Sequence, residues 1–266
     1  MDFTGTKPLI ISCGVGGWYP AGIDRLEKSL IHHGYAGDML FWRNEYPPHS
    51  PSHQENPYAF KIYAFREAFN RGYSKVMWLD CSFWNVKNCH HLFDIIIDKG
   101  NFAFRSGYNL GQTCPDNLLE YVGITRDQAW ELPETATGIV GINYDNPEGK
   151  AVFDYGAEMC DLGYFKNSRN HNPEESQDPR FLFGRQDQSA YGMALYKAGV
   201  FCVGRFICII GDEMVSLDKL RELHKGARIA RDGSYRDWDD LSNNQLKKIF
   251  LVVEDLLYKC ENIVTT

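Results

Sequence analysis

Apolar positions are grouped in two ways along the first eighty residues, as short continuous runs and as stripes at helical spacing. Short runs bounded by turn residues predict buried strands, and the stripes predict helices that pack one face on a core. The elements predicted in this way are a strand at 9–13, a helix at 21–33, a strand at 38–42, a helix from Asn56 to about 71 and a strand at 76–79. This alternation of strand and helix is typical of a parallel α/β sheet.

Glycine, proline and asparagine mark the ends of these predicted elements. Gly34 and Gly72 follow the last apolar positions of the two helices, where glycine commonly ends a helix. Asn56 is expected to cap the second helix, with Pro57 at its first position. The segment 43–55 before that helix is rich in Pro, His and Ser and is typical of a long surface loop. Loops of this length in compact domains often carry function.

The later part of the chain continues this mixture of apolar runs and polar segments. The elements predicted there are strands at 102–104, 138–142 and 201–203, a polar loop at 164–186, a helix at 187–197 and a C-terminal helical segment at about 241–262. Because no internal repeat or convincing linker interrupts the chain, we expect one domain over residues 1–266. Its expected class is α/β, with a Rossmann-like, mixed but mostly parallel sheet flanked by helices.

Composition places the chain among ordinary globular proteins. Of its 266 residues, 44% are hydrophobic and 24% are charged. No stretch reaches the roughly 20 apolar residues of a membrane span. The first residues show no basic segment followed by an apolar one, so no secretory signal is expected. These features predict a cytoplasmic protein.

Charge and cysteine spacing narrow the function classes. The formal net charge is −7, whereas a dedicated duplex-DNA binder usually has a basic surface. The 8 cysteines contain no C-x-x-C pair, which argues against a zinc ribbon or a disulfide scaffold. We therefore expect reduced, mostly buried thiols, and a nucleic-acid partner is disfavoured.

The candidate chemistry begins where the apolar run 76–79 ends in Asp80. In an open α/β sheet, ligands bind outside the carboxyl ends of the strands, so this carboxylate faces a ligand crevice. A buried carboxylate is costly alone, so a cation or strong donors should lie beside it. Asp80 and Ser82 have the spacing of a D-x-D motif with its second acid replaced, which could hold Mn²⁺ or Mg²⁺ weakly against a diphosphate. The alternative is that Asp80 caps the next turn.

The glycine-rich turn at 13–17 invites comparison with the dinucleotide fingerprint G-x-G-x-x-G. The comparison fails because Tyr19 occupies the third glycine position. Glycines after a first strand still let a backbone approach a ligand closely, and Trp18 and Tyr19 could stack on a base. An ordinary tight turn with packed aromatic rings is the alternative.

Several polar residues outside these turns have two possible interpretations. Lys61, one turn into its predicted helix, could reach a phosphate or could simply be solvated. The segment 185–188 opens a predicted helix, where an acid and amides could cap free N–H groups. The histidine pairs at 32–33 and 90–91 lack companion ligands at metal spacing, and we interpret them as structural or exposed. His224 is uninformative by itself.

Taken in order, four segments resemble glycosyltransferases of the GT-A fold. Residues 19–30 resemble the loop and helix after the first strand of those enzymes, and 60–80 resemble their helix followed by the metal-binding strand. Residues 136–143 are similar to the small-residue strand on the acceptor side, and 184–190 resemble the Asp-Gln segment that opens a late helix. Together these segments span most of residues 8 to 200.

The resemblance implies a role for each matching residue. Those it implies at the donor are Cys13, Gly14, Tyr19, Lys61, Asp80 and Ser82, and those at the sugar or acceptor are Thr137, Gly138 and Gln188. The implied ligands of Mn²⁺ or Mg²⁺ are Asp80, Ser82 and His224. Ser82 stands where the family usually has a second acid, which weakens the metal site. Asp187 would lie at the reacting centre and, in an inverting enzyme, would take the acceptor's proton.

The function expected from this resemblance is metal-assisted transfer of a sugar from a nucleotide-diphosphate donor to a hydroxyl acceptor. The acceptor would be a glycan or a small molecule. One alternative in the same class is transfer to a modified nucleic-acid base. Other classes are a metal-dependent phosphohydrolase or nucleotidyl transferase, which normally needs more acids near Asp80, and a nucleotide-sugar-binding protein without catalysis.

Overall fold

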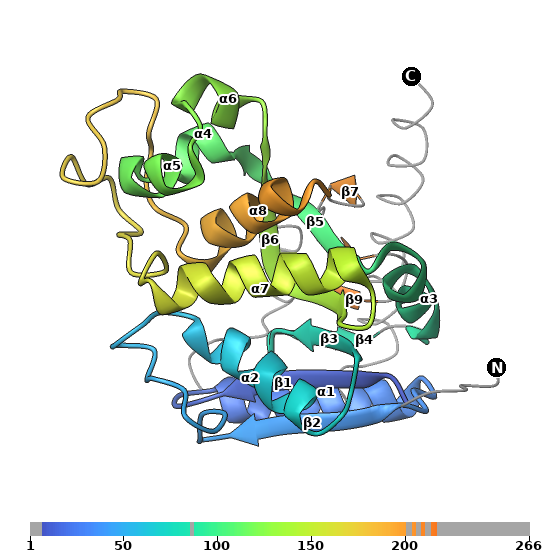
Figure 1. Cartoon of the computed structure of the whole chain (residues 1–266). Helices are drawn as coiled ribbons and strands as arrows, with labels where there is room; N and C mark the ends of the chain where they lie inside the picture. Colours follow the sequence, from blue (N-terminus) through green and yellow to red (C-terminus); the bar gives the residue numbers. More distant parts are fainter. Residues whose placement is uncertain (1–6, 86–87, 201–203, 206–208, 211–213, 217–266) are drawn as a thin grey trace.

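The computed structural model describes residues 7–85 and 88–200 and three short strands near 204–216 (Figure 1). The strands are β1 (Leu9–Gly14), β2 (Asp38–Arg43), β3 (Lys75–Leu79), β4 (Phe83–Asn85), β5 (Asn101–Asn109), β6 (Pro133–Asn143), β7 (Gly204–Arg205), β8 (Ile209–Ile210) and β9 (Met214–Ser216). The helices are α1 (Tyr19–His32), α2 (Ala59–Asn70), α3 (His90–Lys99), α4 (Leu110–Thr113), α5 (Asp116–Val122), α6 (Arg126–Trp130), α7 (Pro147–Asp161) and α8 (Asp187–Ala198).

The main sheet has six strands in the order β2-β1-β3-β6-β5-β7. β1 is parallel to both β2 and β3, and β5 is parallel to β7. β6 is antiparallel to both of its neighbours, β3 and β5. It is therefore the one strand of this sheet that runs against the others, and the predicted mixed, mostly parallel α/β fold is confirmed. A second sheet, with the order β4-β9-β8, adds three short strands.

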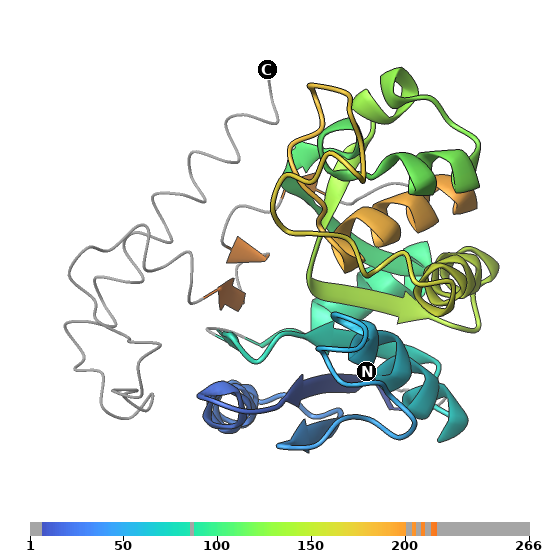
Figure 2. The same ribbon diagram turned by 90° about the vertical axis from the view of Figure 1, so that its left-hand side faces the viewer.

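Helices cover both faces of the main sheet (Figure 2). Alternate side chains of β1 point to opposite faces, so Ile11 joins the core beneath α2 and α7 while Ile10 joins the core beneath α1 and α3. In β3, Trp78 joins the same core as Ile11, and Met77 joins the same core as Ile10. A strand that is buried on both faces reads as a continuous apolar run, which explains why 9–13 and 76–79 could be recognised.

Most predicted elements are present with different ends, whereas β4 and the helices α3 to α7 were not predicted. β5 and β6 extend well beyond the short apolar runs that predicted them, and 164–186 contains no helix or strand. The helix predicted at 187–197 corresponds to α8. The strand predicted at 201–203 and the C-terminal helical segment at 241–262 lie outside the described residues. Among the helices that the structure describes, none has the length and apolar character to cross a bilayer.

The predicted start of α2 was wrong. The helix begins at Ala59, and the residue before it, Tyr58, adopts the left-handed backbone conformation with φ 59° and ψ 4°. The side chain of Asn56 does not cap this helix, because its Nδ2 donates to the carbonyl of Cys160 at 3.2 Å. That carbonyl belongs to the last turn of α7, so a tertiary contact outweighs the local capping preference.

The loop at 164–186 is attached to the start of α8. Asn167 Oδ1 accepts the backbone N–H of Gln186 at 2.7 Å. Asn167 also packs on Gly184, where a β-carbon would lie 2.2 Å from the same oxygen. Only glycine permits so close an approach, so Gly184 lets the loop dock where α8 begins.

Candidate functional site

A cavity of about 430 Å³ lies at the carboxyl ends of β1 and β3. This is where an open α/β sheet binds its ligands. Six of the residues predicted to bind substrate or metal line it, namely Cys13, Gly14, Tyr19, Asp80, Ser82 and Gln188. They come from distant parts of the chain, since Cys13 and Gln188 are 175 positions apart in the sequence. The fold therefore brings together both ends of the predicted site.

A buried polar cluster lies beside the cavity and contains three further predicted residues. Lys61 Nζ donates to Asp187 Oδ2 at 2.9 Å and to the Thr137 carbonyl at 2.9 Å. The Thr137 hydroxyl donates to the same Asp187 oxygen at 2.6 Å. Lys61 Nζ also lies 3.4 Å from Asp80 Oδ1. Side-chain exposure is 8% for Lys61, 6% for Asp187 and 35% for Asp80, so Asp80 is the member of the cluster that meets the cavity.

Asp80 has the neighbours that a buried carboxylate needs. Besides Lys61, the indole Nε1–H of Trp78 donates to Oδ1 at 2.8 Å. Burial raises the pKa of Asp80, and Lys61 and Trp78 oppose that shift. The turn after β3 is closed by a backbone hydrogen bond from the Phe83 N–H to the Asp80 carbonyl. The expectation of a cation and a strong donor beside Asp80 is confirmed, and the turn is closed without its carboxylate.

Lys61 is neither solvated nor open to the cavity. Its ammonium lies 5.0 Å from the centre of the Tyr58 ring and 5.6 Å from that of Trp78. Burial alone lowers the pKa of Lys61, but the carboxylates of Asp187 and Asp80 outweigh it and hold the pKa above its ordinary value. The lysine therefore stays charged and is committed to the two acids.

Gly138 maintains the position of Asp80 from the facing strand. A β-carbon at this position would lie 2.9 Å from the Phe83 ring and 3.4 Å from Asp80 Oδ2. The Asp80 N–H donates to the Gly138 carbonyl at 2.8 Å. A larger residue here would displace either the ring or the carboxylate.

Further cavity residues were not predicted as site residues, including Tyr46, His53, Tyr58 and Arg169. His53 Nδ1 accepts the Tyr58 N–H at 3.2 Å, and the His53 N–H donates to the Tyr46 hydroxyl at 3.1 Å. Burial lowers the pKa of His53. The length and composition of 43–55 marked that loop as functional, but no sequence signal pairs it with Arg169.

Two helices at the site begin with strained residues. Tyr58, with φ 59°, precedes the helix that carries Lys61, and Gln186, with φ 54°, precedes the helix that Asp187 opens. Residues other than glycine rarely adopt such angles, and strain of this kind concentrates at functional sites. The strain therefore supports the same location as the cavity and the polar cluster.

The residues present fit a divalent metal held mainly through one carboxylate. Trp78 and Lys61 contact Asp80 Oδ1, and both Asp80 and Ser82 line the cavity. Mg²⁺ commonly uses one or two carboxylates and takes its other ligands from water and phosphates. In the part of the chain that the structure describes, no three His, Cys, Asp or Glu side chains form a ready metal cluster. His224 lies outside the described residues.

Within the described residues, His90 makes a structural contact and the cysteines are buried thiols, as predicted. The ring of His90 accepts the Ala36 N–H at 2.9 Å, a structural contact. Cys13, Cys81, Cys89, Cys114 and Cys160 are all buried free thiols.

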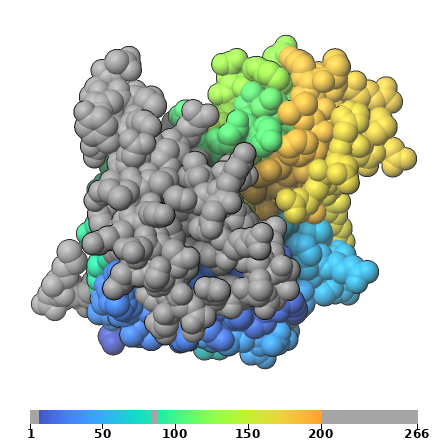
Figure 3. All heavy atoms as spheres, turned by 180° about the vertical axis from the view of Figure 1, so that it is seen from behind, coloured from blue at the N-terminus to red at the C-terminus, as the bar shows by residue number. Residues whose placement is uncertain are grey.

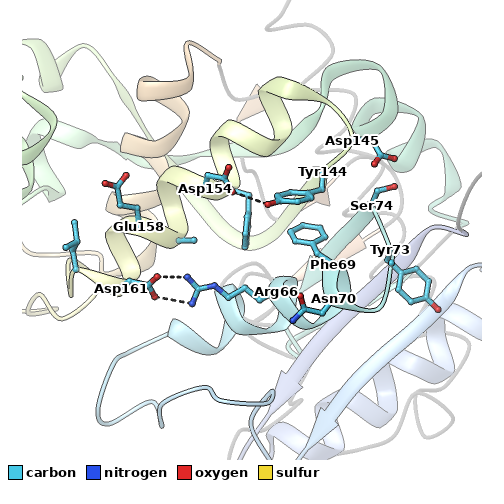
Figure 4. A pocket seen from close by; sticks show the side chains of 14 residues that line it. Arg66, Phe69, Asn70, Tyr73, Ser74, Tyr144, Asp145, Asp154, Glu158 and Asp161 are labelled. Carbon is cyan, nitrogen blue, oxygen red and sulfur yellow. Dashed lines mark hydrogen bonds and ion pairs between the residues drawn. The ribbon is translucent and has the colours of Figure 1, made fainter.

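A larger cavity, of about 880 Å³, lies elsewhere, between α2 and α7 (Figure 4). None of the predicted site residues lines it. Its charged groups pair with protein partners, as Arg66 does with both carboxylate oxygens of Asp161. Size alone therefore does not identify the candidate site.

Comparison with known proteins gives structural similarities only. No protein-family model and no curated protein matches this chain. Among solved structures, the chain is similar to the WbbM bifunctional glycosyltransferase, with 12% identity, 96% of this chain and 45% of that chain covered, and a TM-score of 0.45. It is also similar to the galactosyltransferase LgtC, solved with donor and acceptor sugar analogs. The identity is 14%, the match covers 73% of this chain and 72% of that chain, and the TM-score is 0.41. A third similar structure is the glycosyltransferase GlyE of Streptococcus pneumoniae. The identity is 14%, the match covers 74% of this chain and 45% of that chain, and the TM-score is 0.39.

This chain spans less than half the length of WbbM and of GlyE. At TM-scores below 0.5, these similarities carry no argument about the site. These three solved structures are glycosyltransferases.

Proposed function

We propose that the protein is a glycosyltransferase that moves a sugar from a nucleoside-diphosphate donor to a hydroxyl acceptor, a glycan or a small molecule. The observation that carries the proposal is the meeting of aromatic side chains and one carboxylate, Asp80, in a cavity at the carboxyl ends of β1 and β3. Aromatic walls suit a nucleobase and a sugar ring, and the carboxylate suits a metal that binds phosphates.

The donor end of the cavity is formed by the first strand and helix. Gly14 lines the cavity and lets the end of β1 pack closely on the start of α1, because a β-carbon there would lie 2.6 Å from the Tyr19 carbonyl. Trp18 and Tyr19 lie with their ring centres 4.8 Å apart, and Tyr19 is 43% exposed. An exposed aromatic ring at the edge of the cavity supports stacking on the donor base.

Asp80 and Ser82 would hold Mn²⁺ or Mg²⁺ together with the donor diphosphate. When bound, the ion would offset the negative charge that develops on the leaving nucleoside diphosphate. Lys61 and Trp78 orient Asp80 and favour its ionised form, which is the contribution of the protein side chains at this point. The buried ammonium also balances the two acids that surround it.

Asp187 is the candidate base for the acceptor hydroxyl. Lys61 and Thr137 both donate to its Oδ2, which fixes the carboxylate, and the next residue, Gln188, lines the cavity. In an inverting reaction such a base takes the proton as the hydroxyl attacks the anomeric carbon. Thr137 and Gly138, beside it on β6, would border the sugar or acceptor.

A second candidate function is nucleotide-sugar binding without catalysis. It is favoured by Ser82, which replaces an acid, and by the low exposure of Asp187. Transfer to a nucleic-acid base has no comparable support in the cavity residues.

The test is a donor panel with matched variants. UDP-glucose, UDP-galactose, UDP-N-acetylglucosamine, UDP-xylose and GDP-mannose are added with Mn²⁺ or with EDTA, and thermal shift and nucleotide release are measured. We expect one donor to bind and to release its nucleotide with Mn²⁺. Asp80→Asn should abolish release, whereas Asp154→Asn, an acid in the cavity of Figure 4, should not.

Two other results of this panel would change the assignment. If no donor binds the wild-type protein, the transferase proposal fails. If a donor binds but its sugar is transferred neither to water nor to any sugar acceptor tried, so that no nucleotide is released, the binding-protein alternative replaces the transferase proposal.

A further inference from the structure

The cations at the candidate site are unequally available to a ligand. Lys61 is enclosed by Asp187, Asp80 and Thr137 and does not line the cavity. Among the described residues that do line it, Arg169 is the single lysine or arginine. A nucleoside diphosphate carries at least two negative charges, and Asp80 adds another. Arg169 is therefore the side chain with a positive charge left for the phosphates.

Arg169 is held at the cavity through a tyrosine. Its Nη1 donates to the Tyr58 hydroxyl at 3.3 Å, and within the described part of the chain it forms no ion pair. The loop before α2 lies beneath the loop that carries Arg169, as the view from behind shows (Figure 3). A guanidinium has five N–H donors, so the contact with Tyr58 leaves others for a ligand.

Both partners of this contact are anchored. The Arg169 loop is fixed by the Ser168 N–H, which donates to Glu175 Oε1 at 2.6 Å, and by the contact of Asn167 with the start of α8. Tyr58 is constrained by its left-handed backbone and by its N–H bond to His53. Because the loop backbone is anchored, less chain entropy is lost when Arg169 binds phosphate.

His53 adds a neutral donor to the same wall of the cavity. A backbone N–H can only donate, so the His53 Nδ1 that receives the Tyr58 N–H carries the lone pair. The proton of the neutral ring is therefore on Nε2. Because burial lowers the pKa of His53, the ring stays neutral near pH 7 and keeps this arrangement.

We propose that Arg169, with His53 beside it and Tyr58 as its positioning residue, forms a phosphate subsite that binds the terminal phosphate of a nucleoside diphosphate. The proposal rests on the proposed function, because it assigns one part of the donor to one wall of the same cavity. In the intact donor, this phosphate is the one that bears the sugar. A guanidinium can hold such a phosphate through two parallel hydrogen bonds.

The test compares ligands that differ by one phosphate. Isothermal titration measures Kd for UDP, UMP and uridine, or the guanosine series if GDP binds better, with the wild-type protein and Arg169→Gln. The matched control is Arg180→Gln, an arginine of the same loop that pairs with Asp178 and Asp127 and does not line the cavity. Thermal unfolding checks that each variant is folded.

We expect Arg169→Gln to weaken UDP binding roughly 10- to 100-fold while leaving uridine within about twofold. UMP should change much less than UDP, and Arg180→Gln should match the wild-type protein. Tyr58→Phe should weaken UDP by a smaller factor and leave uridine unchanged, which a merely structural role would not produce.

Three results would overturn the proposal. UDP binding by Arg169→Gln within about twofold of wild type would show that Arg169 does not bind phosphate. Equal weakening of UMP and UDP would move its contact to the first phosphate. If the wild-type protein binds neither UDP nor GDP, the proposed function fails with it, whereas the first two results leave that function standing.

Discussion

Replacing Lys61 by methionine tests whether the buried cluster is an ion pair on which stability depends. The substitution keeps an unbranched side chain that is one atom shorter, and it removes the ammonium with its charge and its hydrogen bonds to Thr137 and Asp187. It leaves Asp187, with 6% side-chain exposure, and Asp80 beside it without the ammonium that lies 2.9 and 3.4 Å away. Removing one partner of a buried pair costs about 3–5 kcal/mol, because the remaining charge stays buried and unpaired.

Lys75→Met is the matched control. Lys75 Nζ lies 3.2 Å from Asp145 Oδ2, a similar distance, but the Asp145 side chain is 68% exposed. Exposed pairs contribute about 0–1 kcal/mol. Urea unfolding of both variants at pH 7.5 should therefore show a free-energy loss several times larger for Lys61→Met than for Lys75→Met.

The pH dependence of Lys61→Met provides a second check. Burial raises the pKa of Asp80 and Lys61 opposes that shift, so without the ammonium the pKa of Asp80 rises further and the folded variant binds a proton more readily than the unfolded chain. Its stability therefore falls as pH rises, so its deficit relative to wild type should shrink between pH 7.5 and 4.5. A loss no larger than that of Lys75→Met, or a deficit that stays constant with pH, would refute this account of the cluster.

Three further predictions follow from single neighbours of the cavity. Gly138→Ala places a methyl 2.9 Å from the Phe83 ring. We expect a stability loss of about 1–3 kcal/mol by urea unfolding, together with weaker Mn²⁺-dependent donor binding. Unchanged stability and donor affinity would contradict the close packing at Gly138. Ser82→Asp supplies a second carboxylate beside Asp80 and should tighten Mn²⁺ binding roughly 10-fold by titration, whereas equal affinity would remove Ser82 from the metal site. Burial lowers the pKa of His53 below 6.5, so its contribution to stability is present above pH 6.5 and is lost as pH falls through the folded pKa. His53→Asn should therefore flatten the stability curve between pH 7 and 5, and parallel curves would contradict this.

Local pattern was sufficient for the elements on which the site is built. The runs at 9–13 and 76–79 predicted β1 and β3, because a strand buried on both faces excludes polar residues along its length. The residue that ends the second run is Asp80, and its position after a buried strand was enough to place it at a ligand crevice. Spacing also predicted α8, and so placed Asp187 at a helix start.

Strand order and direction needed the tertiary structure. The apolar run at 138–142 predicted a strand, but nothing local says that β6 lies between β3 and β5 or that it runs against them. Antiparallel pairing brings Gly138 beside Asp80 and Thr137 beside Lys61. These contacts depend on register between strands, which a single segment does not contain.

The sequence by itself therefore determined the α/β class, the strands β1, β2, β3, β5 and β6, the helices α1, α2 and α8, and the candidate site residues as separate positions. Only the tertiary structure decided how their charges combine. Lys61 and Asp187 are 126 residues apart, and Tyr58 and Arg169 are 111 apart, so no local spacing relates them. Burial made Lys61 a partner of two acids, and a loop contact brought Arg169 to the cavity. The physical reason is that periodicity reflects which face of an element is buried, whereas ion pairs and cavities arise from how the elements pack together.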